Sequence, residues 1–540
     1  MINPQTLARR RILLGLAGLL VPLAAGFLVR ASNLSAESAW YDEVITLEVL
    51  DAPTLSGFLE GAAKTSAPMP PAYFVLEYYA AKLGPDPEFS LRVLSVLIGL
   101  ASIAIVQATA WRIYGPWAGF VAGAAMAASP IHVYYSQEIR GYELTTLLGG
   151  MSALTFMELL RRNRRSWLLL NFVANTLLVW THPFAALALG AQAALLVLFR
   201  RKELGLVAPW MTLAAVTSVS IGLWGVSLDR GVAYQQMNWI QAPGFFSSPS
   251  GISVYGAFVA FAGNFYGHPT NQAAEMVNRY REPIQTLTVA ITAFLVIAYI
   301  GFARGHRTCT RGEGKLTHRE AACFFGLWLL FPPLALYALS YLWTPCFFVR
   351  YLLFSSVALY VIMGAGMTRV TNRALSGALM GMLLAIWAVQ IVTVLPGPSR
   401  ADWSSLASLM KTANPDHHRA IVAQTVGDNR KAFAYHLADP AYALEPARNL
   451  DSIVSAIDEA ETLHEDLWVA VPWGNGMAVF DPPLFQISWQ MEDYLRLIGR
   501  RFTRYEARTG RILYLYHVPW SIRERDPESY LLELGEADTK

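Results

Sequence analysis

Two neighbouring carboxylates near the start of the chain are the first residues that could do chemistry. They lie in Trp40-Tyr41-Asp42-Glu43, beyond a long apolar segment. A carboxylate held beside an apolar surface is suited to take a proton from an acceptor hydroxyl or amine. Asp42 has an equally good structural role, because an Asp that precedes a helix beginning at Val44 would be its N-cap. The sequence alone leaves these two roles open.

Two arginines offer the complementary chemistry, which is the binding of an anion. Arg140 lies in Ser136-Gln137-Glu138-Ile139-Arg140-Gly141-Tyr142, and Arg350 is followed by Tyr351. A guanidinium can hold a phosphate group through paired N–H donors. Each arginine also has a structural alternative. Glu138 with Arg140 could be an interfacial ion pair with a snorkelling arginine, and Arg350 with Tyr351 could be an interfacial anchor.

Two histidines are weaker candidates. His182 joins two apolar segments and could cap a helix or take part in the chemistry, whereas His268 lies in an aromatic-rich loop where a histidine is usually only solvated. The sequence contains no metal-site spacing, no glycine-rich phosphate loop and no Ser nucleophile elbow. We therefore expect no certain cofactor, with a divalent metal at Asp42 and Glu138 kept as an alternative.

Long apolar segments must position these residues. The chain has 540 residues, of which 54% are hydrophobic and only 15% are charged, against about 25% charged in an average soluble protein. A helix needs about 20 mainly apolar residues to cross a bilayer. The sequence predicts about eleven such helices, at Ile12–Val29, Phe89–Ile113, Trp117–Tyr134, Tyr142–Leu160, Trp167–Trp180, Pro183–Phe199, Leu204–Leu228, Ile284–Phe302, Ala321–Trp343, Tyr351–Met367 and Ala374–Leu395.

Basic residues predict which loops face the cytoplasm, because Lys and Arg in short loops resist translocation. They collect at Arg9–Arg11, Arg161–Arg165, Arg200–Lys202, Arg304–Arg319 and Arg369–Arg373. The alternating loops 31–88 and 229–283, and the chain after residue 396, are then expected outside. The loop 31–88 is expected to contain interfacial helices. The net charge of +3 is too small to indicate a nucleic-acid partner.

The last part of the chain has an ordinary soluble composition. We expect a membrane domain at residues 1–396 and an outer α/β domain at residues 397–540. The expected elements of the outer domain are strands at Ala420–Gln424 and Leu467–Val471, helices at Leu450–Leu463 and Ile487–Ile498, and a hairpin of Phe502–Ala507 with Ile512–His517. The predicted fold class is a polytopic α-helical membrane protein with a C-terminal soluble α/β domain.

The positions of the ionisable residues favour a site at the outer interface. A carrier needs polar groups or broken helices near the middle of the bilayer. The predicted helices are almost free of charge there, and the candidate residues lie instead in the outer loops and at the outer ends of helices. Such a site could receive one substrate from the bilayer and another from the aqueous side.

Several short segments, all on the same predicted side of the membrane, carry a resemblance to a known family. They are Trp40–Glu43, Pro68–Phe74, Ser90–Ser95, Ser129–His132 with Ser136–Tyr142, Thr181–Phe184 and Arg350–Leu352. In order and spacing they resemble the integral-membrane GT-C glycosyltransferases, particularly the family 39 group with the protein O-mannosyltransferases and the lipid A aminoarabinose transferases. The eukaryotic protein mannosyltransferases have an inserted lumenal domain, for which the loop 229–283 is too short.

The resemblance implies an inverting transfer of one sugar from a polyprenyl-phosphate donor to an acceptor at the outer face. In such enzymes the Asp of the first loop acts at the acceptor, which corresponds here to Asp42, with Glu43 beside it. Positive charge must stabilise the departing lipid phosphate. The expected phosphate contacts are Arg140, Arg350 and Arg92, and the expected orienting residues are Glu138, His182 and His268.

The implied partners are a polyprenyl-phosphate-linked sugar, an acceptor that is a protein, a lipid or a glycan, and membrane lipids. The implied location is the cytoplasmic (inner) membrane of a bacterium, with the active site and the C-terminal domain on the periplasmic side. Two alternatives remain, which are a flippase or other transporter of lipid-linked sugars and a non-catalytic envelope assembly factor. The sequence decides neither the sugar nor the acceptor.

Overall fold

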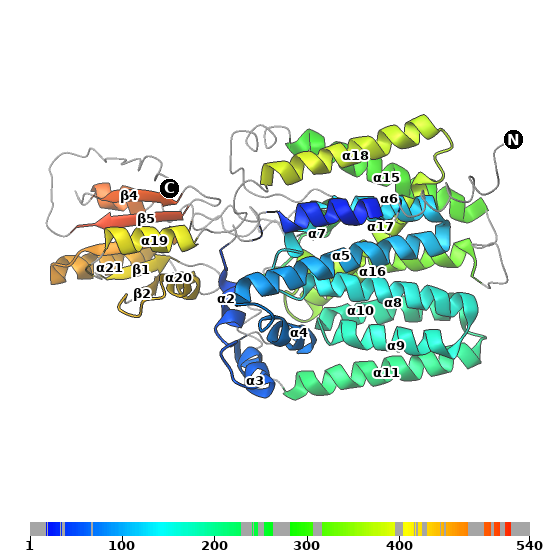
Figure 1. Ribbon diagram of the computed structural model, residues 1–540, viewed down its shortest axis with the longest axis horizontal. Coiled ribbons are helices and arrows are strands. Elements are labelled where there is room, and N and C mark those ends of the chain that lie inside the picture. The colour runs from blue at the N-terminus through cyan, green and yellow to red at the C-terminus, as the bar shows by residue number, and fades with distance from the viewer. Residues whose placement is uncertain are drawn as a thin grey trace. The chain divides into compact units, whose positions relative to one another are not determined.

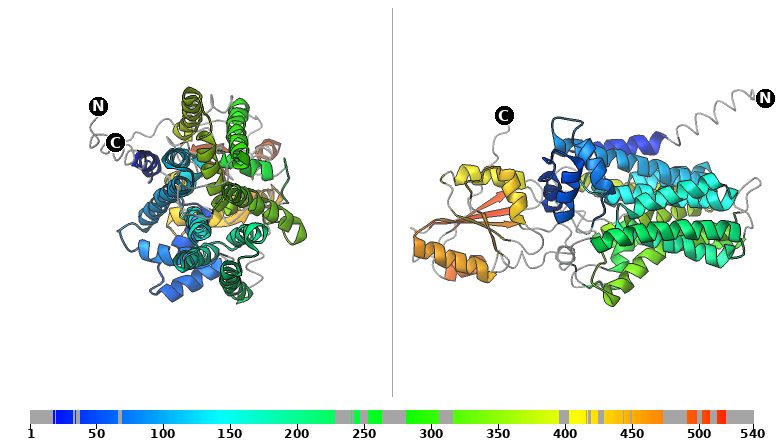
Figure 2. Two further views of the ribbon diagram at one scale, coloured as in Figure 1. Left: turned by 90° about the vertical axis from the view of Figure 1, so that its right-hand side faces the viewer. Right: turned by 90° about the horizontal axis from the view of Figure 1, so that it is seen from below.

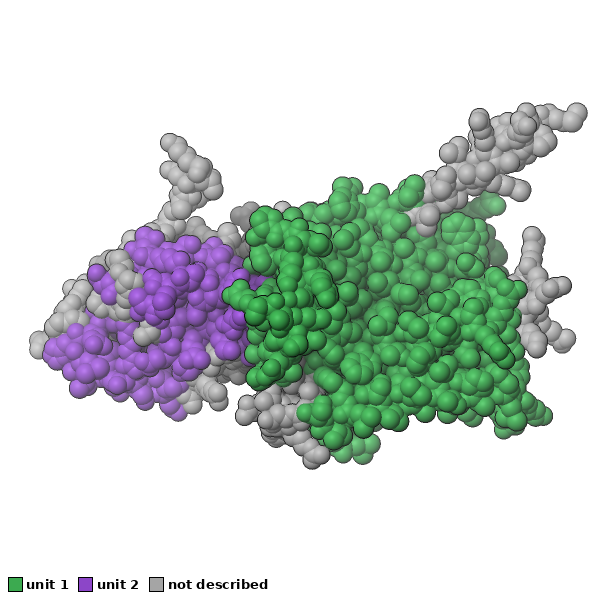
Figure 3. Space-filling model, turned by 60° about the horizontal axis from the view of Figure 1, so that its bottom comes forward, with its two compact units in different colours: residues 1–34, 49–265, 279–391 green, residues 35–48, 266–278, 392–540 purple. Residues whose placement is uncertain are grey.

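The computed structural model is mostly helical, with one small sheet in the C-terminal part (Figures 1 and 2). It divides into two compact units (Figure 3). Unit 1 contains Met1–Leu34, Val49–Phe265 and Arg279–Ile391, and unit 2 contains Ser35–Glu48, Tyr266–Asn278 and Val392–Lys540. The structure describes residues 18, 20–32, 34, 38–65, 69–227, 240, 242–246, 253–262, 281–305, 316–394, 403–414, 416, 419–423, 429–442, 444–447, 450–472, 491–497, 502–507 and 513–519.

Unit 1 is a bundle whose long helices run side by side (Figure 1). Its first helix spans Leu20–Ala31. Two short helices follow in the first loop, α3 (Leu55–Thr65) and α4 (Ala72–Ala80). The others are α5 (Pro87–Tyr114), α6 (Pro116–Ala127), α7 (Pro130–Tyr135), α8 (Tyr142–Arg162), α9 (Arg165–Val179), η1 (Pro183–Ala186), α10 (Leu187–Leu195), η2 (Leu196–Arg200), α11 (Leu204–Ser227), α13 (Val254–Phe261), α15 (Arg281–Gly305), α16 (His318–Leu342), η3 (Val349–Leu352), α17 (Leu353–Met367) and α18 (Arg373–Val394).

Among the described residues, six helices are long and apolar enough to cross a membrane. They are Pro87–Tyr114, Pro183–Arg200, Leu204–Ser227, Pro283–Gly301, His318–Leu342 and Val349–Met367. Four shorter apolar helices lie at Leu20–Ala31, Pro116–Ala127, Arg165–Val179 and Arg373–Val389. The prediction of a polytopic helical membrane protein is confirmed, whereas the predicted number of eleven spans is not.

The third predicted span is wrong as a single helix. The structure ends α6 at Ala127 and begins α7 at Pro130. Pro130 has no N–H to donate, and its ring disfavours a helical conformation of Ser129, so a continuous helix is interrupted here. The break leaves the short helix α7 directly before the loop that carries Glu138 and Arg140.

Helix α17 is the most deeply buried helix of unit 1, because every residue of Leu353–Met367 is buried. Two glycines allow its close packing. A side chain at Gly364 would collide with the carbonyl oxygen of Ala118 in α6, and a side chain at Gly366 would collide with that of Leu295 in α15. Small residues let helix backbones approach each other in membrane proteins, where packing and interhelical hydrogen bonds drive association.

Uncharged polar side chains join four helices inside the bundle. Gln192 of α10 donates to the hydroxyl of Ser152 of α8 at 2.7 Å. On α9, Asn175 donates to the side chain of Asn171 at 3.1 Å. Trp210 of α11 donates to the same Asn171 oxygen at 2.9 Å. Because these groups satisfy one another, they fit a structural role in holding the helices together.

Unit 2 contains a five-stranded sheet in the order β2-β1-β3-β5-β4. β1 pairs in parallel with β2 and β3, whereas β5 pairs antiparallel with β3 and β4. The strands are β1 (Ala420–Ala423), β2 (Leu444–Ala447), β3 (Leu467–Pro472), β4 (Thr503–Ala507) and β5 (Leu513–Val518). The labelled helices in the described part of unit 2 are α2 (Tyr41–Leu47), α19 (Trp403–Ala413), α20 (Asn429–Leu437) and α21 (Leu450–Leu463).

One apolar core holds the sheet of unit 2 to α21, with Ile453, Ile457 and Val469 fully or almost fully buried. The predicted α/β layer is confirmed, and so are the two expected strands, the helix α21 and the pairing of the hairpin strands. Of the predicted helix Ile487–Ile498, residues 491–497 are described and are helical. The division between residues 396 and 397 stays a prediction.

Candidate active site

The loop Ser136–Gly141 joins α7 to α8 and carries two charged side chains inside unit 1. Glu138 is 1% exposed and Arg140 is 7% exposed. The alternative in which Arg140 snorkels toward water is therefore wrong, because its side chain is enclosed by protein. Charged groups are costly to bury without compensating interactions. Their burial indicates that the surrounding structure is built around them.

Helix α5 holds the backbone of this loop. Arg92 donates from Nη1 to the carbonyl oxygen of Gln137 at 2.8 Å, and Ser95 donates from Oγ to the carbonyl oxygen of Glu138 at 2.6 Å. A second nitrogen of Arg92 donates to Glu88, one turn earlier, at 2.9 Å. Arg92 therefore positions the loop, and its expected contact with phosphate stays a prediction.

The end of the first helix holds the loop from another side. Arg30 is fully buried and donates from Nε to the hydroxyl of Ser136 at 3.0 Å. Gln137 donates from its side chain to the backbone carbonyls of Arg30 at 2.9 Å and Ser32 at 3.0 Å. Arg30 was not among the site residues predicted from the sequence, although a lone arginine at the end of an apolar helix is a visible feature.

Gly141 brings two further segments against the loop. A side chain at this position would lie 3.0 Å from Cβ of Tyr73 in α4 and 3.3 Å from Cγ2 of Thr181. Next to this contact, the backbone N–H of Ala72 donates to the carbonyl of Trp180 at 3.1 Å. A larger residue at this position would require its neighbours to move by a few tenths of an ångström. The close approach places the segment that contains His182 beside the loop.

Aromatic rings surround Arg350, which lies in η3. Its guanidinium carbon is 4.6 Å from the ring centre of Phe348, 5.2 Å from that of Tyr142 and 5.6 Å from that of Tyr351. Arg350 is 6% exposed, so the alternative of an interfacial anchor in contact with water is wrong. Cation–π contacts hold a guanidinium in place while it stays protonated. Arg350 is thus a fixed positive charge in a buried setting.

His182 completes this cluster, and its ring centre is 4.7 Å from that of Tyr351. It occupies the N-cap position of η1, but its side chain makes no capping hydrogen bond, so the capping alternative is wrong. Neither ring nitrogen has a hydrogen-bond partner within the described part of the chain. Burial and, second, the charge of Arg350 lower the pKa of His182, which lies outside the membrane-spanning helices, to about 3. The neutral ring offers one N–H donor and one acceptor.

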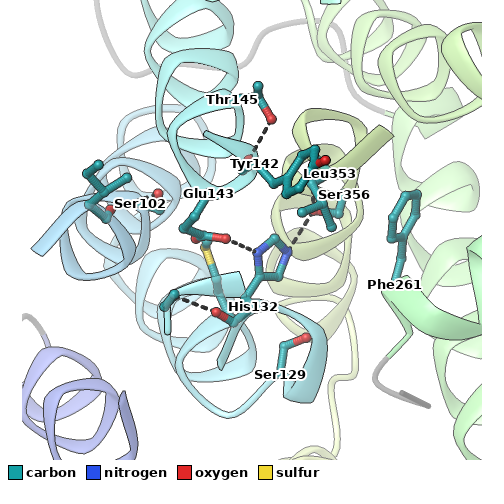
Figure 4. Close-up of polar contacts among 12 residues, drawn as sticks. Ser102, Ser129, His132, Tyr142, Glu143, Thr145, Phe261, Leu353 and Ser356 are labelled. Atoms are coloured by element: carbon teal, nitrogen blue, oxygen red, sulfur yellow. Dashed lines mark hydrogen bonds and ion pairs between the residues drawn. The ribbon is translucent and has the colours of Figure 1, made fainter. Parts of the chain in front are cut away.

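A second buried network joins α7, α8 and α17 (Figure 4). Nδ1 of His132 lies 3.0 Å from Oε2 of Glu143, and Nε2 lies 2.9 Å from Oγ of Ser356. The order of these groups is that of a catalytic triad. Ser356, however, donates its proton to the carbonyl of Leu353 at 2.6 Å. Its oxygen therefore accepts a hydrogen bond from His132, which argues against a nucleophile.

This network holds the two ends of the loop to α17. His132 lies before the loop and Glu143 lies after it, and both are bound to Ser356 directly or through the imidazole. His132 belongs to the family-like segment Ser129–His132, but the sequence predicted no role for it. Glu143 was not among the predicted site residues.

The carboxylate pair lies in unit 2, at the start of α2. The helix begins at Tyr41 and has Trp40 at the N-cap position, so the alternative of Asp42 as the N-cap is wrong. Glu43 is buried, and its Oε2 accepts a hydrogen bond from the backbone N–H of Trp40 at 3.3 Å. Asp42 is half-buried. The two acids therefore differ. Glu43 is buried and closes the first turn of the helix, whereas the side chain of Asp42 is still partly exposed.

Unit 1 thus collects arginines and a neutral histidine from the loop, from the segment before η1 and from η3. Such a group can hold an anion by charge and donate a hydrogen bond to it. In the described ranges, no group of three His, Cys, Asp or Glu side chains could hold a metal ion. His268 lies outside the described residues.

A known protein family matches part of the chain in sequence. Residues 68–224 match the family of dolichyl-phosphate-mannose-protein mannosyltransferases. The matched stretch contains the loop Ser136–Gly141 and His182, but neither Asp42 nor Arg350. No curated protein sequence matches the chain.

Solved structures resemble it over nearly its whole length. The crystal structure of ArnT from Cupriavidus metallidurans in the apo state has a TM-score of 0.51 and 12% sequence identity, over 94% of this chain and 98% of that chain. The structure of ArnT bound to undecaprenyl phosphate has a TM-score of 0.50 at 12% identity, with the same coverage. The chain therefore has the fold of the GT-C membrane glycosyltransferases, and residues 68–224 match one of their families. The predicted resemblance and fold class are confirmed.

The predicted enzyme class, a glycosyltransferase that uses a polyprenyl-phosphate-linked sugar, is confirmed by the match in sequence together with the match in fold. The fold also confirms a multi-pass membrane protein. The individual roles of Asp42, Glu43, Arg140, Arg350 and Glu138 stay predictions.

Proposed function

We propose that this glycosyltransferase transfers one sugar from a polyprenyl-phosphate donor to an acceptor at the periplasmic face of a bacterial cytoplasmic membrane, with inversion of the anomeric centre. The observation that carries the proposal is the buried charge of Arg350 beside neutral His182, with the buried Arg140 in the loop whose Gly141 lies close to Thr181. A buried cationic group suits a phosphate that stays charged while it is bound. The fold similarity to ArnT, whose structure contains undecaprenyl phosphate, supports a polyprenyl phosphate as the lipid carrier.

In the proposed reaction, an acceptor hydroxyl or amine attacks the anomeric carbon from the face opposite the phosphate. The bond between this carbon and the phosphate oxygen breaks as the new bond forms, and a single displacement inverts the centre. The acceptor proton passes to the carboxylate of Asp42. The bonding electrons leave with the polyprenyl phosphate, whose added negative charge is stabilised by Arg140 and Arg350. Glu138 and His182 orient the reacting groups.

The periplasmic side is supported by the distribution of basic residues. The runs Arg161–Arg165 and Arg200–Lys202 mark one side of the bundle. Both follow helices whose other ends lead to the loop Ser136–Gly141 or to His182. A lipid-linked donor in the outer leaflet would therefore present its phosphate on the side of Arg140 and Arg350.

Release of the lipid carrier tests the proposal. Purified protein in liposomes receives a panel of undecaprenyl-phosphate monosaccharides, together with peptide, lipid or glycan acceptors, and undecaprenyl phosphate is measured. We expect release from one donor with the wild type. Arg350→Ala should lower the rate by at least about 100-fold, because a fixed charge at the leaving group is lost. Lys64→Ala, which removes an exposed lysine of an exposed ion pair, is the control that should keep the wild-type rate.

Three outcomes would contradict the proposal or one of its parts. Movement of intact donor across the bilayer without release of undecaprenyl phosphate would support the flippase instead. If Arg350→Ala releases undecaprenyl phosphate at the wild-type rate, Arg350 does not bind the phosphate. A protein that shows neither transport nor release with any donor of the panel fits the envelope assembly factor.

A further inference from the structure

The C-terminal part of the chain holds the segment that precedes Asp42, within unit 2. Ser38 and Ala39 lie just before α2. Ser38 contacts Ser404, 366 residues later, and Ala39 contacts His436, 397 residues later. These partners lie on α19 and α20, so a short piece of the first loop is built into the C-terminal domain.

Ser38 caps α19 from another part of the chain. Its Oγ accepts a hydrogen bond from the backbone N–H of Ser404 at 3.3 Å and lies 3.0 Å from the Ser404 hydroxyl. Ser404 is the second residue of α19. The first N–H groups of a helix have no partner within the helix. Ser38 therefore supplies an acceptor that α19 needs, and the contact fixes both segments.

His436 holds the next residue. Its Nε2 lies 2.9 Å from the carbonyl oxygen of Ala39. A carbonyl oxygen can only accept, so Nε2 carries the proton and donates it. Helix α20, which carries His436, packs on α2 and on α19, where the rings of Trp403 and Phe433 are 5.8 Å apart. The two helices thus form one support for residues 38 and 39.

The short helix α2 depends on tertiary contacts for its position. It has seven residues, and isolated helices shorter than about 12 residues are marginal in water. At its far end, Glu48 and Lys431 are 3.8 Å apart and both are more than one third exposed, so this pair contributes little. The hydrogen bonds at residues 38 and 39 act three to four residues before Asp42, where they fix the start of the helix.

We propose that the C-terminal domain positions Asp42 for the transfer step, with His436 and the Ser38–Ser404 pair as positioning residues. The inference rests on the proposed function, because it requires Asp42 to be the base. A base must lie within hydrogen-bond distance of the proton that it takes. A displacement of about 1 Å can lower a rate by a factor of about 100. The domain therefore acts on kcat and leaves the binding of the donor unchanged.

The test begins with His436→Leu in the full-length protein, which removes the donor to Ala39. We expect kcat to fall about tenfold, while KM for the undecaprenyl-phosphate monosaccharide used as donor changes by less than about twofold. His436→Gln should restore most of kcat, because its amide nitrogen can take the place of Nε2. Lys431→Gln, on the same helix, removes only the exposed pair and is the matched control that keeps the wild-type kcat.

Two further measurements separate positioning from a general loss of structure. Hydrogen–deuterium exchange in His436→Leu should increase in peptides that cover residues 38–47 and stay unchanged in β1 and β3. The double variant Asp42→Asn with His436→Leu should be no slower than Asp42→Asn alone, because the base is already lost. A wild-type kcat in His436→Leu, or losses that multiply in the double variant, would overturn the inference.

A cross-link decides the question if His436→Leu does not fold. Ser38→Cys with Ser404→Cys places two thiols where the hydroxyl oxygens are 3.0 Å apart. Oxidation should keep kcat within about twofold of the reduced form, with Ser404→Cys alone as the control for the three native cysteines. Loss of kcat on oxidation would show that the bound segment is not the active arrangement. If the proposed role of Asp42 is wrong instead, Asp42→Asn keeps the wild-type kcat.

Discussion

The loop Ser136–Gly141 in unit 1 and the segment 38–43 in unit 2 carry complementary parts of the proposed chemistry, and they are held differently. The loop is enclosed by helices, receives hydrogen bonds from α5 and leaves little space for a side chain at Gly141. The segment is partly exposed and is bound to helices of a small separate domain. Dense packing would make the proposed phosphate site rigid, whereas hydrogen bonds at the start of a short helix would let a single substitution change the position of the proposed base.

The largest expected effect comes from Asp42→Asn, which removes the proposed base from the second region. Turnover should fall by about 100- to 10,000-fold, because general-base catalysis contributes that much. Glu43→Gln is the matched control, since Gln also serves at this position of a helix start. Release of undecaprenyl phosphate measures both. An equal loss in both variants would contradict the difference between the two acids and would make Glu43 a candidate for the base.

Gly141→Ala tests the dense packing of the first region. The added methyl group would lie 3.0 Å from Cβ of Tyr73, so the loop or α4 must move. We expect a loss of about 1–3 kcal/mol in the free energy of unfolding, measured by thermal unfolding in detergent. Gly205→Ala, where nothing lies within 4 Å, is the control and should not destabilise the protein. Equal stability of the two variants would show that the loop is more adaptable than its burial suggests.

Arg350→Lys separates charge from shape in the same region. Lysine keeps the positive charge but loses the planar fork that stacks on rings and binds phosphate through two donors. The affinity for undecaprenyl phosphate should fall about tenfold, since cation–π and bidentate contacts contribute about 1 to 2 kcal/mol. Titration of the purified protein with undecaprenyl phosphate measures this. An unchanged affinity would mean that charge alone is sufficient at residue 350.

The smallest expected effect is a dependence of folding stability on pH, which comes from His182 in unit 1. The pKa of His182 is lowered from 6.5 to about 3 by burial, so between these values the unfolded chain binds more protons than the folded protein. The stability contributed by neutral His182 is therefore complete above pH 6.5 and decreases as the pH falls toward 3. His182→Gln should lose less stability between about pH 7 and about pH 5 than the wild type. An equal loss of stability in His182→Gln and in the wild type over this pH range would contradict a buried neutral histidine.

Local patterns predicted much of the fold. Runs of apolar residues indicated the helices of the bundle, and amphipathic spacing indicated α21 with the bounds that the structure has. The position of the loop Ser136–Gly141 was also predictable, because Glu138 and Arg140 lie in a short polar segment between two apolar ones. These features depend on residues that are close in sequence, so one chain suffices to see them.

Contacts between distant residues could not be predicted. Nothing near Ser38 indicates that it caps α19, and nothing near His132 indicates partners 11 and 224 residues away. The strand β2 and the helix α20 were missed because their short, mixed segments carry weak periodicity and are stabilised by neighbours in the sheet.

The sequence by itself determined that this is a membrane protein, which residues are able to transfer a proton or bind a phosphate, and which elements carry them. Composition and periodicity are sufficient for this, because crossing a bilayer and forming a helix are local requirements. Only the tertiary structure decided that Glu43 closes a helix while Asp42 does not, that His182 is neutral and that His436 holds the chain before Asp42. Burial and hydrogen-bond partners follow from the way that distant segments pack, and no local pattern contains that information.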